Sequence, residues 1–326
     1  MQPCSVKAVP RRQEKQQTEI LFLAWNSVEA NAVFEVMRYS PRQTDNVVGS
    51  VKSPGTSLFP GLVTTRVRDR ADVKLFFDRC ASQGSSEQHG DAEGLLRYRL
   101  ALVRSLARPQ PTDVVLDLGC GTGHHLVGLG PEIARGIGID ISPGMIELAG
   151  ARVRDSLWRA KLTFEVDDAE RLHTIPDQSI DLAICIGSFE HMLDKEAVLA
   201  SIVRVLKSGG RFFCLTPHAD YIWYRTLAPL LGIPTKHLSS DRFMTRNEFS
   251  ALLRKSGFHR NQCTAWSFIP KGDMPSAIAI LLTFLDAIGR RARWDSLRGG
   301  LALCARKEAP PASASMDPNS AQGSTQ

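Results

Sequence analysis

Residues 114–124 read Val114-Val-Leu-Asp-Leu-Gly-Cys-Gly-Thr-Gly-His124, which joins a short apolar run to three glycines at alternate positions. The apolar run predicts a buried strand, and the glycines let the backbone turn tightly beside a ligand where a helix begins. A dinucleotide fingerprint would need glycine at the position of His124, so the pattern disfavours NAD. Asp117, at the end of the predicted strand, is unsuited to a pyrophosphate but suits a ligand that carries positive charge.

Short β-rich runs alternate with helical patterns along most of the chain. The predicted strands are Val114–Leu118, Gly136–Asp140, Leu162–Val166, Leu182–Ile186, Arg211–Thr216, His259–Ile269 and Gly300–Ala305. A helix is predicted over 198–206, with Ser208-Gly209-Gly210 as its stop, and Thr245 to Glu248 read as a capping box that begins another. This alternation predicts an α/β fold with a parallel sheet covered on both faces.

Composition divides the chain into three parts. Residues 1–72 contain turn-formers and no sustained period, so we expect a poorly ordered extension with one candidate helix over 18–37. Residues 309–326 are rich in Pro, Ala and Ser and are expected to be disordered. Residues 73–308 are expected to form the domain, with a ligand-binding core over 112–217 and a cap and final strand pair over 218–308.

Charge and cysteine usage narrow the class of protein. The net charge is +6, but residues 1–70 hold 10 of the 40 Lys and Arg and 6 of the 34 Asp and Glu, which leaves 30 against 28 elsewhere. The domain is therefore near neutral, and no nucleic-acid partner is expected. Seven scattered cysteines without zinc-finger spacing predict reduced thiols, a cytoplasmic protein and no metal site. No apolar run is long enough to predict a transmembrane segment.

Two further carboxylates follow the next two predicted strands. Asp140 lies just before Ser142-Pro143, a helix cap, and can accept hydrogen bonds from both hydroxyls of a ribose. Asp168 can accept from an adenine amino group, and the amide of Ala169 can donate to a ring nitrogen. With Asp117, this order favours S-adenosylmethionine, which carries an ammonium group, a sulfonium centre, a ribose and an adenine.

From Asp113 to Pro217 the chain resembles the class I S-adenosylmethionine-dependent methyltransferases of the small-molecule branch, which includes the ubiquinone/menaquinone C-methyltransferases. Residues 117–123 match the first motif of that family, and 175–182 and 206–213 match the segments before its fourth and fifth strands. Asp167 departs from it, because a glycine is common there. The resemblance implies a doubly wound, Rossmann-like, mostly parallel sheet of seven strands with an antiparallel last strand and helical insertions.

The resemblance specifies the cofactor rather than the acceptor. It implies contacts with S-adenosylmethionine from Asp117, Gly119, Gly121, Gly123, Asp140, Ile141, Met145, Asp168, Ala169 and Ile186. The acceptor is expected beside the loops that follow the fourth and fifth strands. Candidate acceptor-side residues in those loops are Glu190, His191, His218, Asp220, Tyr221 and His237.

Three of these candidates are predicted to be catalytic. His218 and Tyr221 directly follow the fifth strand and are preferred over His191, for which a structural role is the alternative, since family members with unrelated acceptors share it. A phenol or amine acceptor must lose a proton, whereas an enolate-like carbon arrives activated. His124 and His125 have no third ligand placed by the sequence, so they predict no metal site.

These features predict O- or C-methylation of a small, apolar or lipid-like acceptor. The alternatives are an RNA methyltransferase and a cofactor-binding interaction module without catalysis. Against the first, the segment after the fourth strand lacks the Asn/Asp-Pro-Pro-aromatic and Pro-Cys runs of base methylases. Residues 275–293 predict a helix that is apolar almost all round and ends in arginines. Such a helix either packs on the domain or covers the acceptor site and contacts a membrane peripherally.

Overall fold

The computed structural model describes residues 64–83, 92–267 and 276–308. The expected extension over 1–63, its candidate helix and the expected tail over 309–326 lie outside these ranges. Thr65, however, pairs with the segment at 237–239: its amide donates to the carbonyl of His237 at 2.8 Å, and its carbonyl accepts from the amide of Ser239 at 2.8 Å. The folded part therefore begins before residue 73, which was the predicted start of the domain.

Seven strands form one sheet in the order β3-β2-β1-β4-β5-β7-β6. Their bounds are β1 Val114–Leu118, β2 Arg135–Asp140, β3 Leu162–Val166, β4 Ile180–Ile186, β5 Leu206–Pro217, β6 Phe258–Trp266 and β7 Gly300–Lys307. The pairs from β3 to β5 are parallel, whereas β7 is antiparallel to both of its neighbours. The predicted α/β class, strand number and antiparallel last strand are confirmed.

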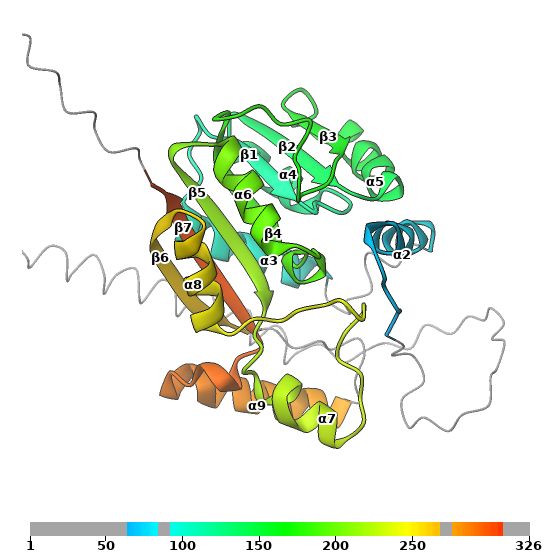
Figure 1. The fold of residues 1–326 in the computed structure, drawn as a ribbon, viewed down its shortest axis with the longest axis vertical. Helices are drawn as coiled ribbons and strands as arrows, with labels where there is room; N and C mark the ends of the chain where they lie inside the picture. Colours follow the sequence, from blue (N-terminus) through cyan, green and yellow to red (C-terminus); the bar gives the residue numbers. More distant parts are fainter. Residues whose placement is uncertain (1–63, 84–91, 268–275, 309–326) are drawn as a thin grey trace, which may run out of the picture.

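Helices cover both faces of the sheet (Figure 1). One core cluster joins the sheet to α6, Lys195–Val205, and α8, Arg246–Lys255. The cluster on the other face joins it to α3, α4 and α5, which span Ala92–Leu102, His124–Leu129 and Pro143–Arg154. Each face buries apolar side chains of the central strands, which explains why these strands read as continuous apolar runs.

One boundary differs from the sequence prediction. Helix α6 ends at Val205, and Ser208, Gly209 and Gly210 belong to β5 rather than to a helix stop. Leu206 has an extended backbone and pairs with Ile180, so the chain enters the sheet directly from the helix. The register shift between Ile180 and Leu182 accommodates the glycine turn, because Gly209 has a φ of 70°.

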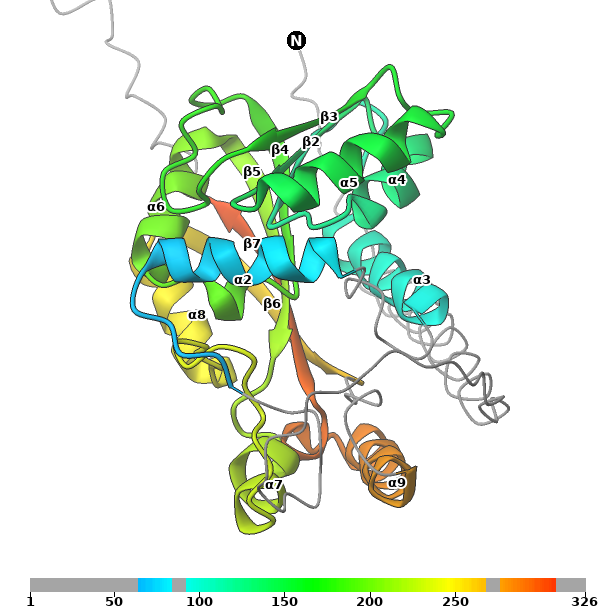
Figure 2. The same cartoon turned by 90° about the vertical axis from the view of Figure 1, so that its right-hand side faces the viewer.

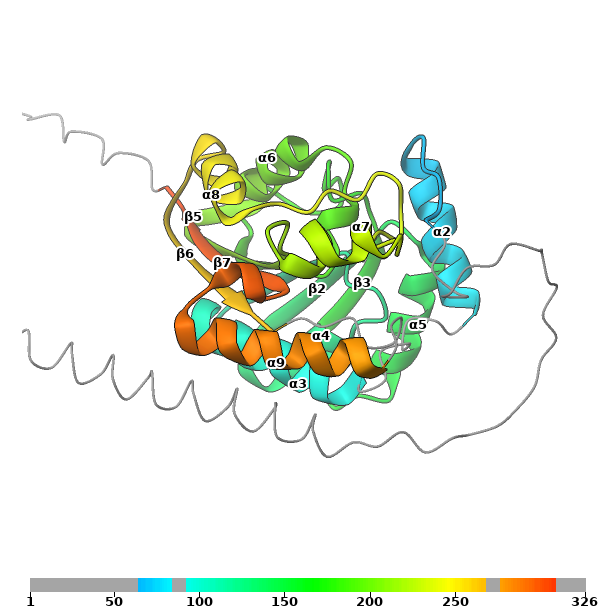
Figure 3. The same cartoon turned by 90° about the horizontal axis from the view of Figure 1, so that it is seen from below.

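Two layers lie over the carboxyl ends of the parallel strands (Figure 2). Helix α2, Arg70–Ser82, packs on α5. A cap at the other side consists of the π-helical turn η5, Trp223–Leu227, the short helix α7, Ala228–Leu230, and α9, Ser276–Ala292. Figure 3 shows α7 and α9 together at the end of the molecule, and Tyr221, Trp223 and Leu282 belong to one buried cluster between them. The predicted helix of 275–293 is therefore formed and is part of the cap.

Candidate active site

A cavity of about 540 Å³ lies at the carboxyl ends of β1, β2, β4 and β5, between α2 and the cap. Its volume is within the usual range for small-molecule sites. Of the ten predicted cofactor-binding residues, eight line it: Gly119, Gly121, Asp140, Ile141, Met145, Asp168, Ala169 and Ile186. The predicted residues Asp117 and Gly123 do not line it.

Gly119 and Gly121 line the cavity, and at Gly119 a side chain would not fit. Gly119 has a φ of 65°, and a Cβ on it would lie 2.6 Å from the Cβ of Ser188. Ser188 is itself fixed, since its hydroxyl donates to the carbonyl of Leu118 at 2.8 Å. Gly123 has a φ of 79° and precedes α4, with the ring of Phe164 against it. Gly123 therefore shapes the turn into α4.

Asp140 is fixed by the loops on either side of it. One carboxylate oxygen accepts from the amide of Gly121 and the other from the amide of Ser142, both at 2.9 Å. Burial raises the pKa of Asp140, although these two hydrogen bonds act in the opposite direction. A buried carboxylate that lines the cavity and has unused lone pairs can accept the two hydroxyls of a ribose.

The loop after β3 is cross-linked to helix α2. Arg70 forms an ion pair with Glu170, and its Nε lies 3.3 Å from a carboxylate oxygen of Asp168. Asp167, which replaces the family's common glycine, accepts from the amide and the hydroxyl of Thr174 at 2.8 Å. The unusual residue therefore stabilises the loop, and Asp168 stays at the cavity where an adenine amino group would need an acceptor.

Asp117 carries the charge that would match the ammonium group at the methionine end of the cofactor. Both carboxylate oxygens of Asp117 are buried without a hydrogen-bond partner among the described residues, and the nearest ring nitrogen of His125 is 3.9 Å away. Burial, together with the charge of Asp140, raises the pKa of Asp117 well above its usual value. A cationic ligand in the adjacent cavity would offset that unfavourable environment, so the donor set fits a ligand with an ammonium group.

Arg99, which sequence reasoning missed, supplies the complementary charge. It lines the cavity from α3, and a Cβ on Gly187 would lie 3.4 Å from one of its terminal nitrogens. Burial lowers its pKa to about 10, although Glu190 opposes this, and it remains a cation at neutral pH. An arginine that lines the cavity beside Gly187 can bind a carboxylate. No local pattern marks this residue, because α3 precedes the motif region.

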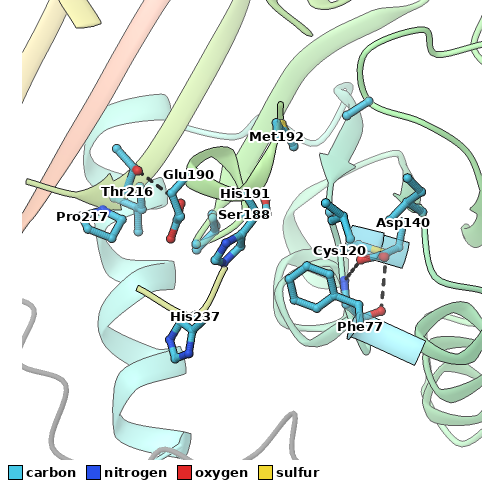
Figure 4. Close-up of a pocket in the computed structure, with 18 of the residues that line it drawn as sticks. Phe77, Cys120, Asp140, Ser188, Glu190, His191, Met192, Thr216, Pro217 and His237 are labelled. Atoms are coloured by element: carbon cyan, nitrogen blue, oxygen red, sulfur yellow. Dashed lines mark hydrogen bonds between the residues drawn. The ribbon is translucent and has the colours of Figure 1, made fainter. Parts of the chain in front are cut away.

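A second group of polar residues lies across the cavity from Asp140 (Figure 4). The Nδ1 of His191 lies 2.7 Å from a carboxylate oxygen of Asp241, and the other oxygen of Asp241 accepts from the amides of His237 and Leu238, both at 3.0 Å. Glu190 accepts from the hydroxyl of Thr216 at 3.2 Å. Glu190, His191 and His237 line the cavity. Asp241 does not line it and contacts His191 through Nδ1 of the imidazole.

The protonation of His191 is set by its neighbours. Burial alone would lower its pKa, but the hydrogen bond with Asp241 and the charges of Glu190 and Asp241 outweigh burial, so its pKa is raised. Burial alone would raise the pKa of Asp241, but its hydrogen bond with His191 outweighs burial, so the pKa of Asp241 is lowered. The pair therefore joins a carboxylate with a lowered pKa to a cavity-lining histidine with a raised pKa, in contact through Nδ1 of the histidine.

The two preferred catalytic candidates lie elsewhere. Tyr221 is fully buried in the cap beneath α9, where burial raises its pKa, and it does not line the cavity. His218 is also buried, with its Nδ1 3.2 Å from the carbonyl of Asp295, and burial lowers its pKa. Both follow β5, as predicted, but the chain turns into the cap there and carries their side chains into its packing. Of the three predicted catalytic residues, only His191 lines the cavity.

Neither a metal-binding cluster nor a helix that could span a membrane occurs among the described residues. No group of three or more His, Cys, Asp and Glu side chains in the described ranges is arranged to hold a metal ion. Within the same ranges, every helix is too short or too polar to span a membrane.

The fold and the cavity together define a class I S-adenosylmethionine-dependent methyltransferase. A model of the family described as "Methyltransferase domain" matches residues 116–214, and the chain is an enzyme of this class that uses S-adenosylmethionine. It is 28% identical over 175 residues to a demethylmenaquinone methyltransferase of Symbiobacterium thermophilum, with 46% of this chain and 69% of that protein covered.

Two further likenesses extend this result. The chain is 31% identical over 166 residues to an O-methyltransferase of Pyrenophora dematioidea, with 48% of this chain and 58% of that protein covered. The crystal structure of the [4+2]-cyclase SpnF matches with a TM-score of 0.57 at 19% identity, over 76% of this chain and 100% of the other. At that identity the structural match supports the fold alone. The chain spans less than two thirds of the length of the Pyrenophora dematioidea relative.

Proposed function

We propose that the protein transfers a methyl group from S-adenosylmethionine to an oxygen, or to an acidic carbon, of a small apolar acceptor, with His191 as the general base. The observation that carries this proposal is the contact of 2.7 Å between His191 and Asp241 at the cavity wall. A histidine held by a carboxylate is a common arrangement for a group that removes a proton.

The lining of the acceptor side supports an apolar molecule. Away from Asp140 and the glycine loop, the cavity is bounded mainly by aromatic and aliphatic side chains. They include Phe77, Trp223, Tyr224, Ile233, Phe243 and Trp266. Such a wall favours a flat or branched hydrophobic molecule and excludes water from the reaction.

The residues divide the chemistry between them. When bound, S-adenosylmethionine supplies an electrophilic methyl group on its sulfonium centre. Asp241 accepts the Nδ1 proton of His191, so that Nε2 can take the proton of an acceptor hydroxyl or of a carbon next to carbonyl groups. Glu190 lies beside His191 and stabilises the imidazolium that results. Arg99 would hold the methionine carboxylate of the cofactor and Asp140 its ribose, and together they would fix the direction of approach.

Localisation in the cytoplasm fits this proposal. All six described cysteines are free thiols, and four of them are buried. Free thiols persist in a reducing compartment.

The test is incubation of a cell extract with the protein and methyl-labelled cofactor, followed by untargeted mass spectrometry. Labelled small molecules that form with wild type and not with His191→Ala support the proposal. Label in RNA would favour the alternative of an RNA methyltransferase instead. Cofactor binding without formation of S-adenosylhomocysteine would contradict methyl transfer and leave the cofactor-binding interaction module.

A further inference from the structure

Exposed apolar side chains are concentrated on the cap. Of the twelve large hydrophobic residues that are exposed in the described ranges, seven lie between residues 230 and 294. They are Leu230, Leu231, Ile280, Leu281, Phe284, Ile288 and Trp294, and we call this set the cap face. The other five are scattered over the rest of the domain, as is usual for single surface residues.

Four residues of the cap face, Ile280, Leu281, Phe284 and Ile288, lie on the outer side of α9, whose inner side is packed against the cap. Leu282 is fully buried on α9, whereas Ile280 and Phe284, two residues before and after it, are 70% and 63% exposed. On the inner side Asp286 accepts from the hydroxyl of Ser267 at 2.5 Å and pairs with Arg298. These contacts fix helix α9 in one orientation. Its other apolar side, which carries Ile280 and Phe284, therefore faces outward.

The same layer forms part of the cavity wall. Trp223 and Ile233 line the cavity and also belong to the buried cluster that contains Leu282. Trp223 and Ile233 therefore connect the cavity wall to the cap core under α9, at the end of the molecule where α7 and α9 lie (Figure 1). An apolar acceptor that enters near the cap would pass from one hydrophobic environment to another.

Positive charge accompanies the apolar surface. Arg291 lies in the last turn of α9 and Arg293 directly follows the helix, and both are exposed. Helix α9 has no acidic residue in its first turn, and its only acid, Asp286, is buried on the inner side. An apolar helix side that lies parallel to a surface and ends in arginines is complementary to anionic lipid head groups.

We infer that the cap face docks on the surface of an anionic lipid bilayer and that the acceptor is a membrane-resident, lipid-like molecule. This inference rests on the proposed function for the acceptor, but the docking itself does not. The helix lies in the interface rather than across it, since α9 has 17 residues and no described helix can span a membrane.

The test is co-sedimentation of the full chain with vesicles of phosphatidylcholine containing phosphatidylglycerol, without cofactor or acceptor. Wild type binds, and Ile280→Ser with Phe284→Ser weakens binding at least roughly tenfold because two side chains lose their burial in the lipid. The matched control is Leu157→Ser, whose side chain is 91% exposed outside the cap; it binds as wild type does. Arg291→Gln with Arg293→Gln reduces binding to anionic vesicles to the weaker level seen with neutral vesicles, which is itself unchanged.

Equal binding by wild type and by the Ile280→Ser, Phe284→Ser variant would overturn the inference, as would no binding by either. Dimerisation of wild type that this variant abolishes, without vesicle binding, would assign the cap face to a second copy of the chain and also overturn it. Unchanged affinity for S-adenosylmethionine shows that the variant is folded. Methyl transfer to a dispersed acceptor tests the proposed function separately, so the two can fail independently.

Discussion

The cofactor side and the acceptor side of the cavity are built in different ways. The cofactor side consists of three strand ends and the turns that directly follow them, so Gly119, Asp140 and Asp168 lie within a few residues of a strand. The acceptor side is assembled from the loop after β4, the segment at 237–241 and the cap, and its central contact joins His191 to Asp241, fifty residues further along the chain. Local sequence therefore specifies the first side, and only tertiary packing specifies the second.

This difference predicts separable defects in variants of the two sides. A residue of the acceptor side should affect turnover and leave cofactor affinity unchanged. A residue of the cofactor side should affect cofactor affinity and leave turnover at saturating cofactor unchanged. A variant that changes both quantities equally would show that the two sides act as one unit.

The largest effect is expected for His191→Ala. Loss of a general base lowers kcat/KM by about 10²- to 10⁴-fold, while calorimetric titration shows cofactor affinity close to that of wild type. His173→Ala is the matched control, because His173 is exposed and lies outside the cavity lining. If turnover falls less than tenfold, His191 is not the base, and an acceptor that arrives already activated becomes the better explanation.

The reverse pattern is expected for Asp140→Ala. Loss of hydrogen bonds to a charged acceptor costs about 1.5–3 kcal/mol, which weakens S-adenosylmethionine binding roughly ten- to a hundredfold. Turnover at saturating cofactor should change much less. Glu147→Ala is the control, since Glu147 is an exposed carboxylate on the neighbouring helix α5. Unchanged affinity in a folded Asp140→Ala protein would remove Asp140 from the site.

The same division explains what the sequence could and could not predict. The strands were located to within a few residues, and eight of ten cofactor residues line the cavity, because strand periodicity and glycine turns are local properties. His218 and Tyr221 were misplaced because proximity to a strand end does not determine where a side chain points once the chain turns into a cap. Arg99 and Asp241 were missed because neither belongs to a local motif.

A smaller effect, and a diagnostic one, is expected for Asp241→Asn. In wild type the pKa of His191 is raised above that of free histidine. As the pH falls through this raised pKa, His191 becomes protonated and can no longer act as a base, so kcat/KM falls. The variant removes the charge that raises this pKa, so the acidic limb of the pH profile moves to lower pH. The maximum falls about tenfold or more, because the amide orients the imidazole less well.

A pH profile of kcat/KM for wild type and Asp241→Asn separates positioning from a merely structural role. A lower maximum with an unmoved acidic limb would indicate that Asp241 only supports the loop at 237–241. A displaced limb would indicate that it controls the proton on His191.

The smallest effect tests whether α2, which the predicted domain boundary divided, belongs to the cofactor side. Arg70 is partly exposed and pairs with Asp168 and Glu170, and exposed ion pairs contribute about 0.2–1 kcal/mol, or at most about fivefold in affinity. Glu170 keeps hydrogen bonds from the amides of Leu193 and Asp194, so Arg70→Ala leaves no buried charge without a partner. We expect cofactor dissociation two- to fivefold faster by stopped flow, with turnover at saturation unchanged. Arg68→Ala is the control, because Arg68 pairs only along α2 with Asp72 among the described ion pairs. Equal rates for the two variants would mean that α2 covers the cofactor side without anchoring it.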